Sequence, residues 1–276
     1  MKRLLLAVIL GALCLSAMPN RSPAPGPLTR QGRGALVIVG GGGTPDDVLV
    51  EALALTGKDS PRVLILPQAS SLEERGMSSV KMWREQGVEH VQILEPLDRP
   101  DARELLDACD LLWIPGGAQR ELMKVLAGNN LVQYIGSLHG KGKVIAGTSA
   151  GAAVMGEVMI SGKADPSNLI AGAMARYRGL GLWPSAIVDQ HFMKRDRYGR
   201  LLTAVLSRPR SLGVGIDERT AVVVQGDDLR VIGDGQVIIY DARKAKVKRA
   251  KAGELQAARD VRMHVLESGE SWTWFQ

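Results

Sequence analysis

The sequence predicts an α/β fold with a largely parallel central sheet and antiparallel hairpins toward the C-terminus. Short apolar, β-branched runs alternate with helical patterns between residues 35 and 146. Strand-like runs separated by Gly-Asp turns follow in the last third of the chain. Apolar strands that alternate with helices are typical of a parallel sheet covered by helices on both faces. The length of 276 residues and the 45% apolar content also favour one soluble globular domain with a sizeable core.

The N-terminus is predicted to be a processing signal. Lys2 and Arg3 precede an uncharged run over residues 4–15, and small residues follow at Ser16 and Ala17. This is the order of a secretory signal, and the run is too short to span a bilayer. We expect a signal over residues 1–17, a disordered leader over 18–33 and a single domain over 34–276. The protein should then be secreted or periplasmic, without a stable membrane anchor. A cytoplasmic start with a buried helix is the alternative.

Within that domain the elements follow in order. Strands are expected at residues 35–39, 62–66, 90–94, 111–114 and 144–146, and helices at 46–55, 72–86, 102–108 and 120–137. Ser71 and Glu74 stand at capping-box spacing at the start of the second helix. Strands at 221–224, 229–232 and 237–240 are separated by turns that favour hairpins. We expect these strands to form an antiparallel edge of one mixed sheet rather than a second domain.

The charge balance leaves several classes of partner open. Basic residues outnumber acidic ones by 35 to 29, a formal net charge of +6, which suits nucleic acid, an anionic surface or an acidic substrate. The basic run over residues 243–251 is interpreted as a solvated strand or loop face. Without the signal, Cys109 is the only cysteine, which excludes an intrachain disulfide and a thiolate metal site. We expect neither a metal nor a cofactor.

The segment over residues 143–155 is the most informative part of the sequence. A strand runs into Gly147-Thr148-Ser149-Ala150-Gly151 and then into an Ala-rich helix. This context is typical of a nucleophile elbow, with Ser149 as the nucleophile. The amide of Ala150, at the start of the helix, is positioned to hold a developing oxyanion. The alternative is a glycine-rich turn that carries a surface serine.

A serine nucleophile needs a base, and the chain offers four histidines. His191 ends an apolar run, so we expect it at the carboxyl end of a strand, where open α/β sheets place their sites. Structural or exposed roles are more ordinary for the others, which are His90, His139 and His264.

The third member should be a carboxylate that orients the imidazole. Asp189 would have to reach the far ring nitrogen from two residues away, so Glu218 is preferred. The resulting order of serine, histidine and acid differs from that of α/β-hydrolases. Gly116 and Gly117 follow a strand, so Gly117 is a candidate second oxyanion donor, although a simple turn explains the pair equally well.

These residues together resemble the cyanophycinase branch of the serine-peptidase family that also contains aspartyl dipeptidase. The matching segments follow the family's order: residues 115–119, 147–156, 188–192 with Arg195, Arg197, Arg200, Leu201 and Leu202, and 215–218. The resemblance implies a three-layer, flavodoxin-like fold akin to class I glutamine amidotransferases, usually found as a homodimer. It also implies a serine exopeptidase that hydrolyses cyanophycin, a poly-aspartate with arginine on each β-carboxyl, to β-Asp-Arg dipeptides.

Carried over by position, the resemblance makes Ser149 the nucleophile, His191 the base and Glu218 its partner. It places a further set of polar residues in the substrate pocket: Gln119, Asp189, Gln190, Arg195, Arg197 and Arg200. Arginine binds carboxylates bidentately, and Asp189 or Glu218 could face a substrate guanidinium.

The sequence leaves alternatives to this function. One is an exported dipeptidase of the same family for Asp-X or isoaspartyl peptides, and another is a catalytically silent, amidotransferase-like binding module. A nucleic-acid binder is disfavoured by the 4% aromatic content and by the absence of a helix-turn-helix signal. Two stretches depart from the family pattern: Gly40–Gly43 is followed by Thr44-Pro45 rather than an acidic residue, and residues 163–177 do not match.

Overall fold

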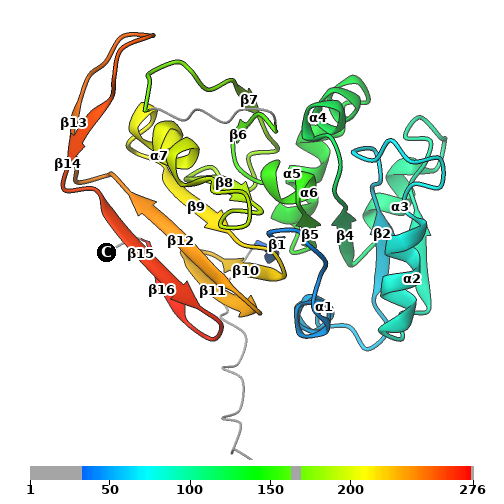
Figure 1. Ribbon diagram of the computed structural model, residues 1–276. Helices are drawn as coiled ribbons and strands as arrows, with labels where there is room; N and C mark the ends of the chain where they lie inside the picture. The colour runs from blue at the N-terminus through cyan, green and yellow to red at the C-terminus, as the bar shows by residue number, and fades with distance from the viewer. Residues whose placement is uncertain (1–32, 163–168, 275–276) are drawn as a thin grey trace, which may run out of the picture.

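Five parallel strands form one half of the central sheet in the computed structural model, which describes residues 33–162 and 169–274 (Figure 1). These strands are β1 (Leu36–Val39), β2 (Arg62–Ile65), β3 (His90–Ile93), β4 (Leu111–Ile114) and β5 (Val144–Thr148). Antiparallel strands β10 (Thr220–Gln225), β11 (Asp228–Gly233) and β16 (Ser271–Thr273) complete the sheet in the order β16-β11-β10-β1-β5-β4-β2-β3. The predicted α/β class, with antiparallel strands toward the C-terminus, is confirmed.

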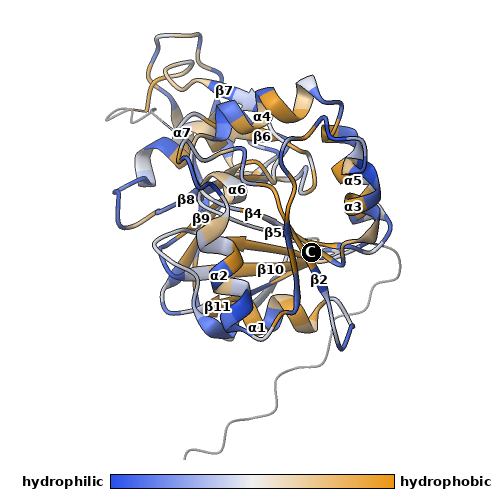
Figure 2. Ribbon diagram, turned by 90° about the vertical axis from the view of Figure 1, so that its right-hand side faces the viewer, coloured by the Kyte–Doolittle hydropathy of each residue, from blue (hydrophilic) through white to orange (hydrophobic). Residues whose placement is uncertain are grey.

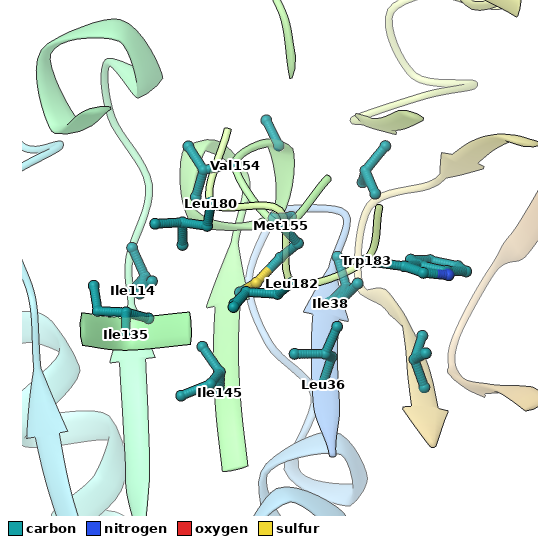
Figure 3. Packing of buried hydrophobic residues seen from close by; sticks show 14 of the residues in the cluster. Leu36, Ile38, Ile114, Ile135, Ile145, Val154, Met155, Leu180, Leu182 and Trp183 are labelled. Carbon is teal, nitrogen blue, oxygen red and sulfur yellow. The ribbon is translucent and has the colours of Figure 1, made fainter. Parts of the chain in front are cut away.

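Helices cover both faces of this sheet because its strands are apolar on both sides. Leu36 and Ile38 of β1 pack in a core that includes residues of α3 (Ala102–Ala108), α4 (Gln119–Gly128), α5 (Val132–Gly140) and α6 (Ala150–Ala153) (Figure 3). Val37 and Val39 face the other way, toward α1 (Asp46–Ala54) and α2 (Met77–Glu85). Figure 2 shows the central strands in hydrophobic colours, while the helices carry both colours.

A second sheet lies beside the first, which the sequence analysis did not predict. Its order is β15-β12-β9-β8, with β8 (Ala186–Gln190) parallel to β9 (Leu212–Ile216), and with β12 (Gln236–Asp241) and β15 (Arg262–Glu267) antiparallel. The expectation that 237–240 continues the edge of one mixed sheet is therefore wrong. The turn before β12 explains why: Asp234 N donates to Arg219 O at 2.9 Å and Gly235 N to Thr220 Oγ1 at 2.8 Å, so the chain leaves β11 toward β9.

Smaller elements complete the fold. Helix α7 (Tyr198–Ser207) packs on the second sheet, where a Cβ at Gly213 would lie only 2.5 Å from Val205. Two short ribbons project from this half of the molecule, one formed by β6 (Val158–Ile160) with β7 (Arg176–Arg178) and the other by β13 (Lys246–Lys248) with β14 (Ala257–Arg259). The basic run is thus an exposed strand and loop, as expected.

Two predicted helices differ from those observed. The helix expected over 72–86 begins only at Met77, because Gly76 has a φ of 89° and the backbone before it forms turns, so the predicted capping box does not cap α2. The helix expected over 120–137 is two helices, α4 and α5, since Asn130 adopts a φ of 55° between them.

The predicted signal and leader fall on residues outside the described ranges, apart from Arg33, and stay predictions. No helix within residues 33–162 and 169–274 is long and apolar enough to cross a membrane.

Candidate active site

The carboxyl ends of four strands meet at the candidate site. Ser149 follows β5, His191 follows β8, Glu218 lies two residues after β9, and the glycine run begins directly after β1. Backbone hydrogen bonds join these ends, since Ser149 N donates to Val39 O at 3.1 Å and His191 N to Gly40 O at 2.7 Å. Gly40, the first residue of the glycine run, therefore links the central sheet to the second sheet beside Ser149 and His191.

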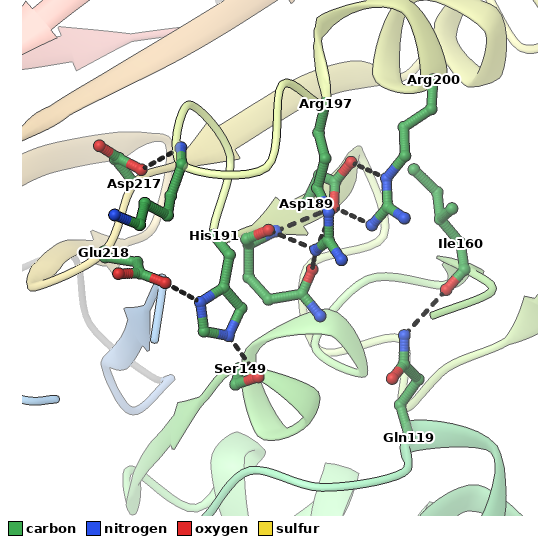
Figure 4. Close-up of polar contacts among 11 residues, drawn as sticks. Gln119, Ser149, Ile160, Asp189, His191, Arg197, Arg200, Asp217 and Glu218 are labelled. Carbon is green, nitrogen blue, oxygen red and sulfur yellow. Dashed lines mark hydrogen bonds and ion pairs between the residues drawn. The ribbon is translucent and has the colours of Figure 1, made fainter. Parts of the chain in front are cut away.

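The structure brings Ser149, His191 and Glu218 into one hydrogen-bonded line (Figure 4). Ser149 Oγ lies 2.9 Å from His191 Nε2, and His191 Nδ1 lies 2.6 Å from Glu218 Oε1. A carboxylate only accepts, so Nδ1 carries the proton that Glu218 binds and Nε2 accepts from the serine hydroxyl. This arrangement lets the imidazole take the hydroxyl proton when Ser149 attacks a carbonyl carbon.

The backbone at the serine is bent into an uncommon conformation. Ser149 has φ 52° and ψ −107°, between the end of β5 and the start of α6. A non-glycine residue is rarely found at such a positive φ, and strain of this kind is concentrated at functional sites. The sharp turn is what a nucleophile elbow requires, because it projects the hydroxyl away from both flanking elements.

The glycine turn after β1 packs directly against the histidine and the glutamate. A Cβ built at Gly41 would lie 2.3 Å from His191 Cε1 and 2.5 Å from Nε2. A Cβ at Gly42 would lie 2.6 Å from the Cβ and 2.8 Å from the Cδ of Glu218. Gly41 and Gly42 also have φ values of 97° and 69°, which favour glycine. From the sequence this run is interpreted only as a tight turn. Its position directly after the first strand was the one signal that it could lie at the active site.

The predicted oxyanion donors lie near the serine. A Cβ at Gly116 would lie 3.3 Å from Ser149 Cβ, and Gly117 comes next in the chain. The backbone beside Gly117 is fixed by a hydrogen bond from Ala118 N to Ala69 O at 2.7 Å. Only glycine fits at position 117, because a Cβ there would lie 2.0 Å from Ala69 O. Ala150 is the first residue of α6. The roles of Gly117 and Ala150 as donors stay predictions.

A cavity of about 320 Å³ opens beside Ser149 and His191. Its walls come from the glycine turn, from the first turns of α2 and from the end of β4: Gly41–Thr44, Ser78, Ser79, Met82, Trp113, Pro115 and Gly116. The indole of Trp113 is fixed by a hydrogen bond from Nε1 to Ser79 Oγ at 3.1 Å. Cavities of about 420 and 430 Å³ lie elsewhere, but they contain none of the three aligned side chains, so chemistry rather than volume identifies the site.

The other residues predicted to bind substrate are mostly used inside the protein. Asp189 is 1% exposed, and its Oδ2 accepts from Arg200 Nε at 2.7 Å while its Oδ1 contacts Arg200 Nη2. Arg197 is also buried, and its Nη1 donates to Gln190 Oε1 at 2.7 Å. Asp189 and Arg200 therefore pair with each other, because helix α7 folds back over β8. The predicted substrate contacts of these residues stay predictions.

Two of the predicted substrate residues have different surroundings. Gln119 is buried at the start of α4, and its Nε2 donates to Ile160 O at 3.1 Å, which ties α4 to β6. Arg195 has an exposed side chain in the loop between His191 and α7. Among the predicted arginines, Arg195 is thus the one that solvent can reach.

Replacing Asp189 by asparagine is expected to lower the free energy of unfolding by about 3–5 kcal/mol, because the buried Arg200 loses its carboxylate. Urea unfolding measures this change. The matched control is the exposed Asp59→Asn, which should stay within about 0.5 kcal/mol of the unsubstituted protein. A D189N variant of unchanged stability but poor substrate binding would instead assign Asp189 to the substrate.

Burial, together with two nearby cations, favours the neutral form of His191. Burial lowers the pKa of His191 below its ordinary value of 6.5, and the hydrogen bond with Glu218 opposes this effect without overcoming it. The nearby cations Arg195 and Arg197 lower the pKa of His191 further. The hydrogen bond with His191 lowers the pKa of Glu218. At neutral pH the site therefore holds a neutral imidazole and an ionised carboxylate, as a general base and its partner require.

The acid limb of the kcat/KM profile should consequently lie below pH 6.5, since that limb reports the protonation of His191 in the free enzyme. Arg195→Gln removes a cation that disfavours the imidazolium, so the pKa of His191 should rise and the limb should move to higher pH. Salt should shrink the shift, because Arg195 is exposed. Lys81→Gln, on α2, is the control. An R195Q profile superimposable on that of the unsubstituted enzyme at low salt would contradict this account.

Cys109 does not compete as a nucleophile, because burial raises the pKa of its thiol to about 12. Within the described ranges no three His, Cys, Asp or Glu side chains gather as metal ligands would.

The elbow serine and its histidine, set at the strand ends of an α/β sheet, place this protein among the serine-type peptidases. More narrowly, the chain belongs to peptidase family S51, whose family model matches residues 36–232. The resemblance found in the sequence is thereby confirmed.

Curated relatives and a solved structure agree with this family. A cyanophycinase from Trichormus variabilis is 34% identical over 241 residues, covering 83% of this chain and 81% of that protein. A cyanophycinase from Geminocystis herdmanii is 32% identical over 254 residues, covering 87% and 93% of the two chains. The crystal structure of a peptidase from an acI-B1 Actinobacterium superimposes with a TM-score of 0.64 at 22% identity, covering 88% of this chain and 98% of that one. That likeness supports the flavodoxin-like fold.

Proposed function

We propose that this peptidase hydrolyses cyanophycin to β-Asp-Arg dipeptides, with Ser149 as nucleophile, His191 as general base and Glu218 as the carboxylate that orients it. The observation that carries the chemistry is the aligned pair of hydrogen bonds, 2.9 Å from Ser149 Oγ to His191 Nε2 and 2.6 Å from His191 Nδ1 to Glu218 Oε1. The substrate rests on the cyanophycinases that match this chain at 32–34% identity over most of both lengths.

The reaction begins at the hydroxyl of Ser149. Oγ attacks the scissile carbonyl carbon while His191 Nε2 takes the hydroxyl proton, and Glu218 stabilises the imidazolium that forms. The amides of Gly117 and Ala150 hold the negative oxygen of the tetrahedral intermediate. The imidazolium then gives its proton to the leaving amine, which departs and leaves an acyl-enzyme. Water, deprotonated by the same imidazole, attacks the ester carbonyl, and Ser149 Oγ recovers its proton as the product acid leaves.

Arg195 is the arginine proposed to meet the substrate. Every arginyl residue of cyanophycin carries a free carboxylate as well as a guanidinium, and Arg195 presents an exposed guanidinium close to His191 in the chain. Arg197 and Arg200 contribute indirectly, because their contacts with Gln190 and Asp189 fix the end of β8 from which His191 projects. All three members of the proposed triad come from one chain, so the predicted homodimer is not needed to complete it.

The test incubates the full-length protein and its S149A variant with purified cyanophycin and follows the products by mass spectrometry. The expected product is β-Asp-Arg, released by the unsubstituted protein and not by S149A. A parallel panel of Asp-X and isoaspartyl dipeptides tests for peptidase activity independently of cyanophycin. Cleavage of short peptides with no release from cyanophycin would overturn the substrate, and release by S149A would overturn the nucleophile.

A further inference from the structure

The positive charge of the chain is concentrated in one exposed segment, residues 243–262, which we call the basic arm. It holds eight Lys and Arg against two Asp and Glu. The rest of the chain from residue 33 onward holds 23 basic against 27 acidic residues. A cationic arm thus extends from a body of net negative charge. The family model matches residues 36–232 and ends before the arm begins.

The basic arm has a defined place in the fold. Its strands β13 and β14 pair as a ribbon, and the loop between them is tied to the chain before β7 by hydrogen bonds from Ala171 N to Glu254 O at 2.9 Å and from Gln256 N to Leu169 O at 2.7 Å. Gln256 Nε2 also donates to Ser207 Oγ at 3.0 Å, at the end of α7. Figure 1 shows the ribbon projecting from the side of the molecule opposite α2 and α3.

Several cations of the arm share one face of the ribbon. Lys246 and Lys248 alternate along β13, and Arg259 stands opposite Lys246 in the antiparallel register. Neighbouring charges on one face of a strand are roughly 7 Å apart. Within the described residues, the ion pairs of the arm join Arg243 to Asp241 at 2.8 Å and Lys246 to Asp260 at 3.7 Å. The exposed cations beyond Arg243 are Lys244, Lys246, Lys248, Arg249, Lys251, Arg259 and Arg262.

Exposed apolar side chains accompany these cations. Leu255, within the arm, is 72% exposed, and Met263 and Val265, which follow it on β15, are 58% and 46% exposed. Cations mixed with exposed apolar residues are typical of surfaces that lie at a membrane interface. Residues 243–262 contain no aromatic side chain to stack on a base. The composition therefore favours a lipid surface over a nucleic acid.

We propose that the basic arm is a peripheral docking surface for the anionic phospholipid headgroups of a membrane. The lysines and arginines attract the headgroup phosphates, and Leu255, Met263 and Val265 contact the boundary with the acyl chains. Binding is reversible and depends on salt, because the attraction is largely between charges at a surface. The proposal is independent of the substrate proposed above, since the arm contributes none of the aligned side chains at Ser149.

The test is co-sedimentation of the full-length protein with vesicles of phosphatidylcholine alone or mixed with phosphatidylglycerol. We expect binding only to the mixed vesicles at low salt. K244Q/K246Q/K248Q/R249Q should weaken it by at least about a hundredfold, with hydrolysis of a soluble substrate unchanged. The control K58Q/K81Q/R84Q/K124Q removes as many exposed charges outside the arm and should bind like the unsubstituted protein.

Three results would overturn the proposal. One is equal binding by the arm variant and the unsubstituted protein, and another is an equal loss in the control variant, which would make the effect one of net charge. The third is absence of binding to either kind of vesicle. The same variants are also tested for binding to duplex DNA at the same salt concentration. Binding to DNA without binding to vesicles would assign the cations to a nucleic acid instead.

Discussion

Replacing Ser149 by alanine should lower kcat on cyanophycin by about 10⁶-fold, because removal of a serine nucleophile leaves only the binding and oxyanion contributions to catalysis. KM should change little, since the side chain lost is small. The fold should be retained, because alanine fits a position where the backbone, not the hydroxyl, makes the elbow. Steady-state kinetics measures the loss, and urea unfolding checks the stability.

The control for this substitution is Ser137→Ala, an exposed serine of α5 whose Oγ donates to Tyr134 O. It should leave kcat within a factor of about two. An S149A variant that turns over cyanophycin at a rate near that of the unsubstituted enzyme would remove Ser149 from the reaction, whatever the geometry of its hydrogen bond.

Gly41→Ala should lower kcat/KM by at least about a hundredfold, although Gly41 carries no reactive group. Its new Cβ would lie 2.3 Å from the imidazole, so the ring must leave the position in which it meets Ser149 Oγ. A displacement of about 1 Å is enough for an effect of this size. The pH dependence should change as well, since a ring pushed off Glu218 loses the hydrogen bond that raises the pKa of His191.

Gly142→Ala separates this contact from ordinary backbone strain. Gly142 has a φ of 90°, close to the 97° of Gly41, but a Cβ there would have no neighbour within 4 Å. Both variants should lose stability by about 1–3 kcal/mol from the forced positive φ. Only G41A should lose activity. Equal activities in the two variants would show that the glycine turn does not position the histidine.

The sequence was most informative where function depends on neighbours in the chain. The strand, turn and helix around Ser149 are local, so the pattern Gly147-Thr148-Ser149-Ala150-Gly151 was enough to predict the elbow. His191 was recognised because it ends an apolar run, and β8 does end immediately before it. Glu218 is preferred over Asp189 because Asp189 is too close in the chain to reach the far ring nitrogen of His191. The structure places Glu218 at the imidazole and Asp189 against Arg200.

What the sequence did not reveal depends on elements that meet only after folding. The contact of Gly41 with His191 joins residues 150 positions apart, and nothing local marks it. The pairing of Asp189 with Arg200 arises because α7 turns back over β8, whereas the sequence shows only that cations follow the histidine. The second sheet was missed for a similar reason, since the turn before β12 takes its direction from hydrogen bonds to Arg219 and Thr220.

The most direct test of the central claim, that Ser149 is a nucleophile activated by His191 and Glu218, is labelling with diisopropyl fluorophosphate followed by peptide mass spectrometry. Ser149 Oγ attacks phosphorus, fluoride leaves, and His191 takes the hydroxyl proton. The account predicts one adduct, on Ser149, in the unsubstituted protein, none on S149A, and labelling slowed at least about a hundredfold in H191A. An adduct on another residue, or an unlabelled protein that still hydrolyses cyanophycin, would contradict it.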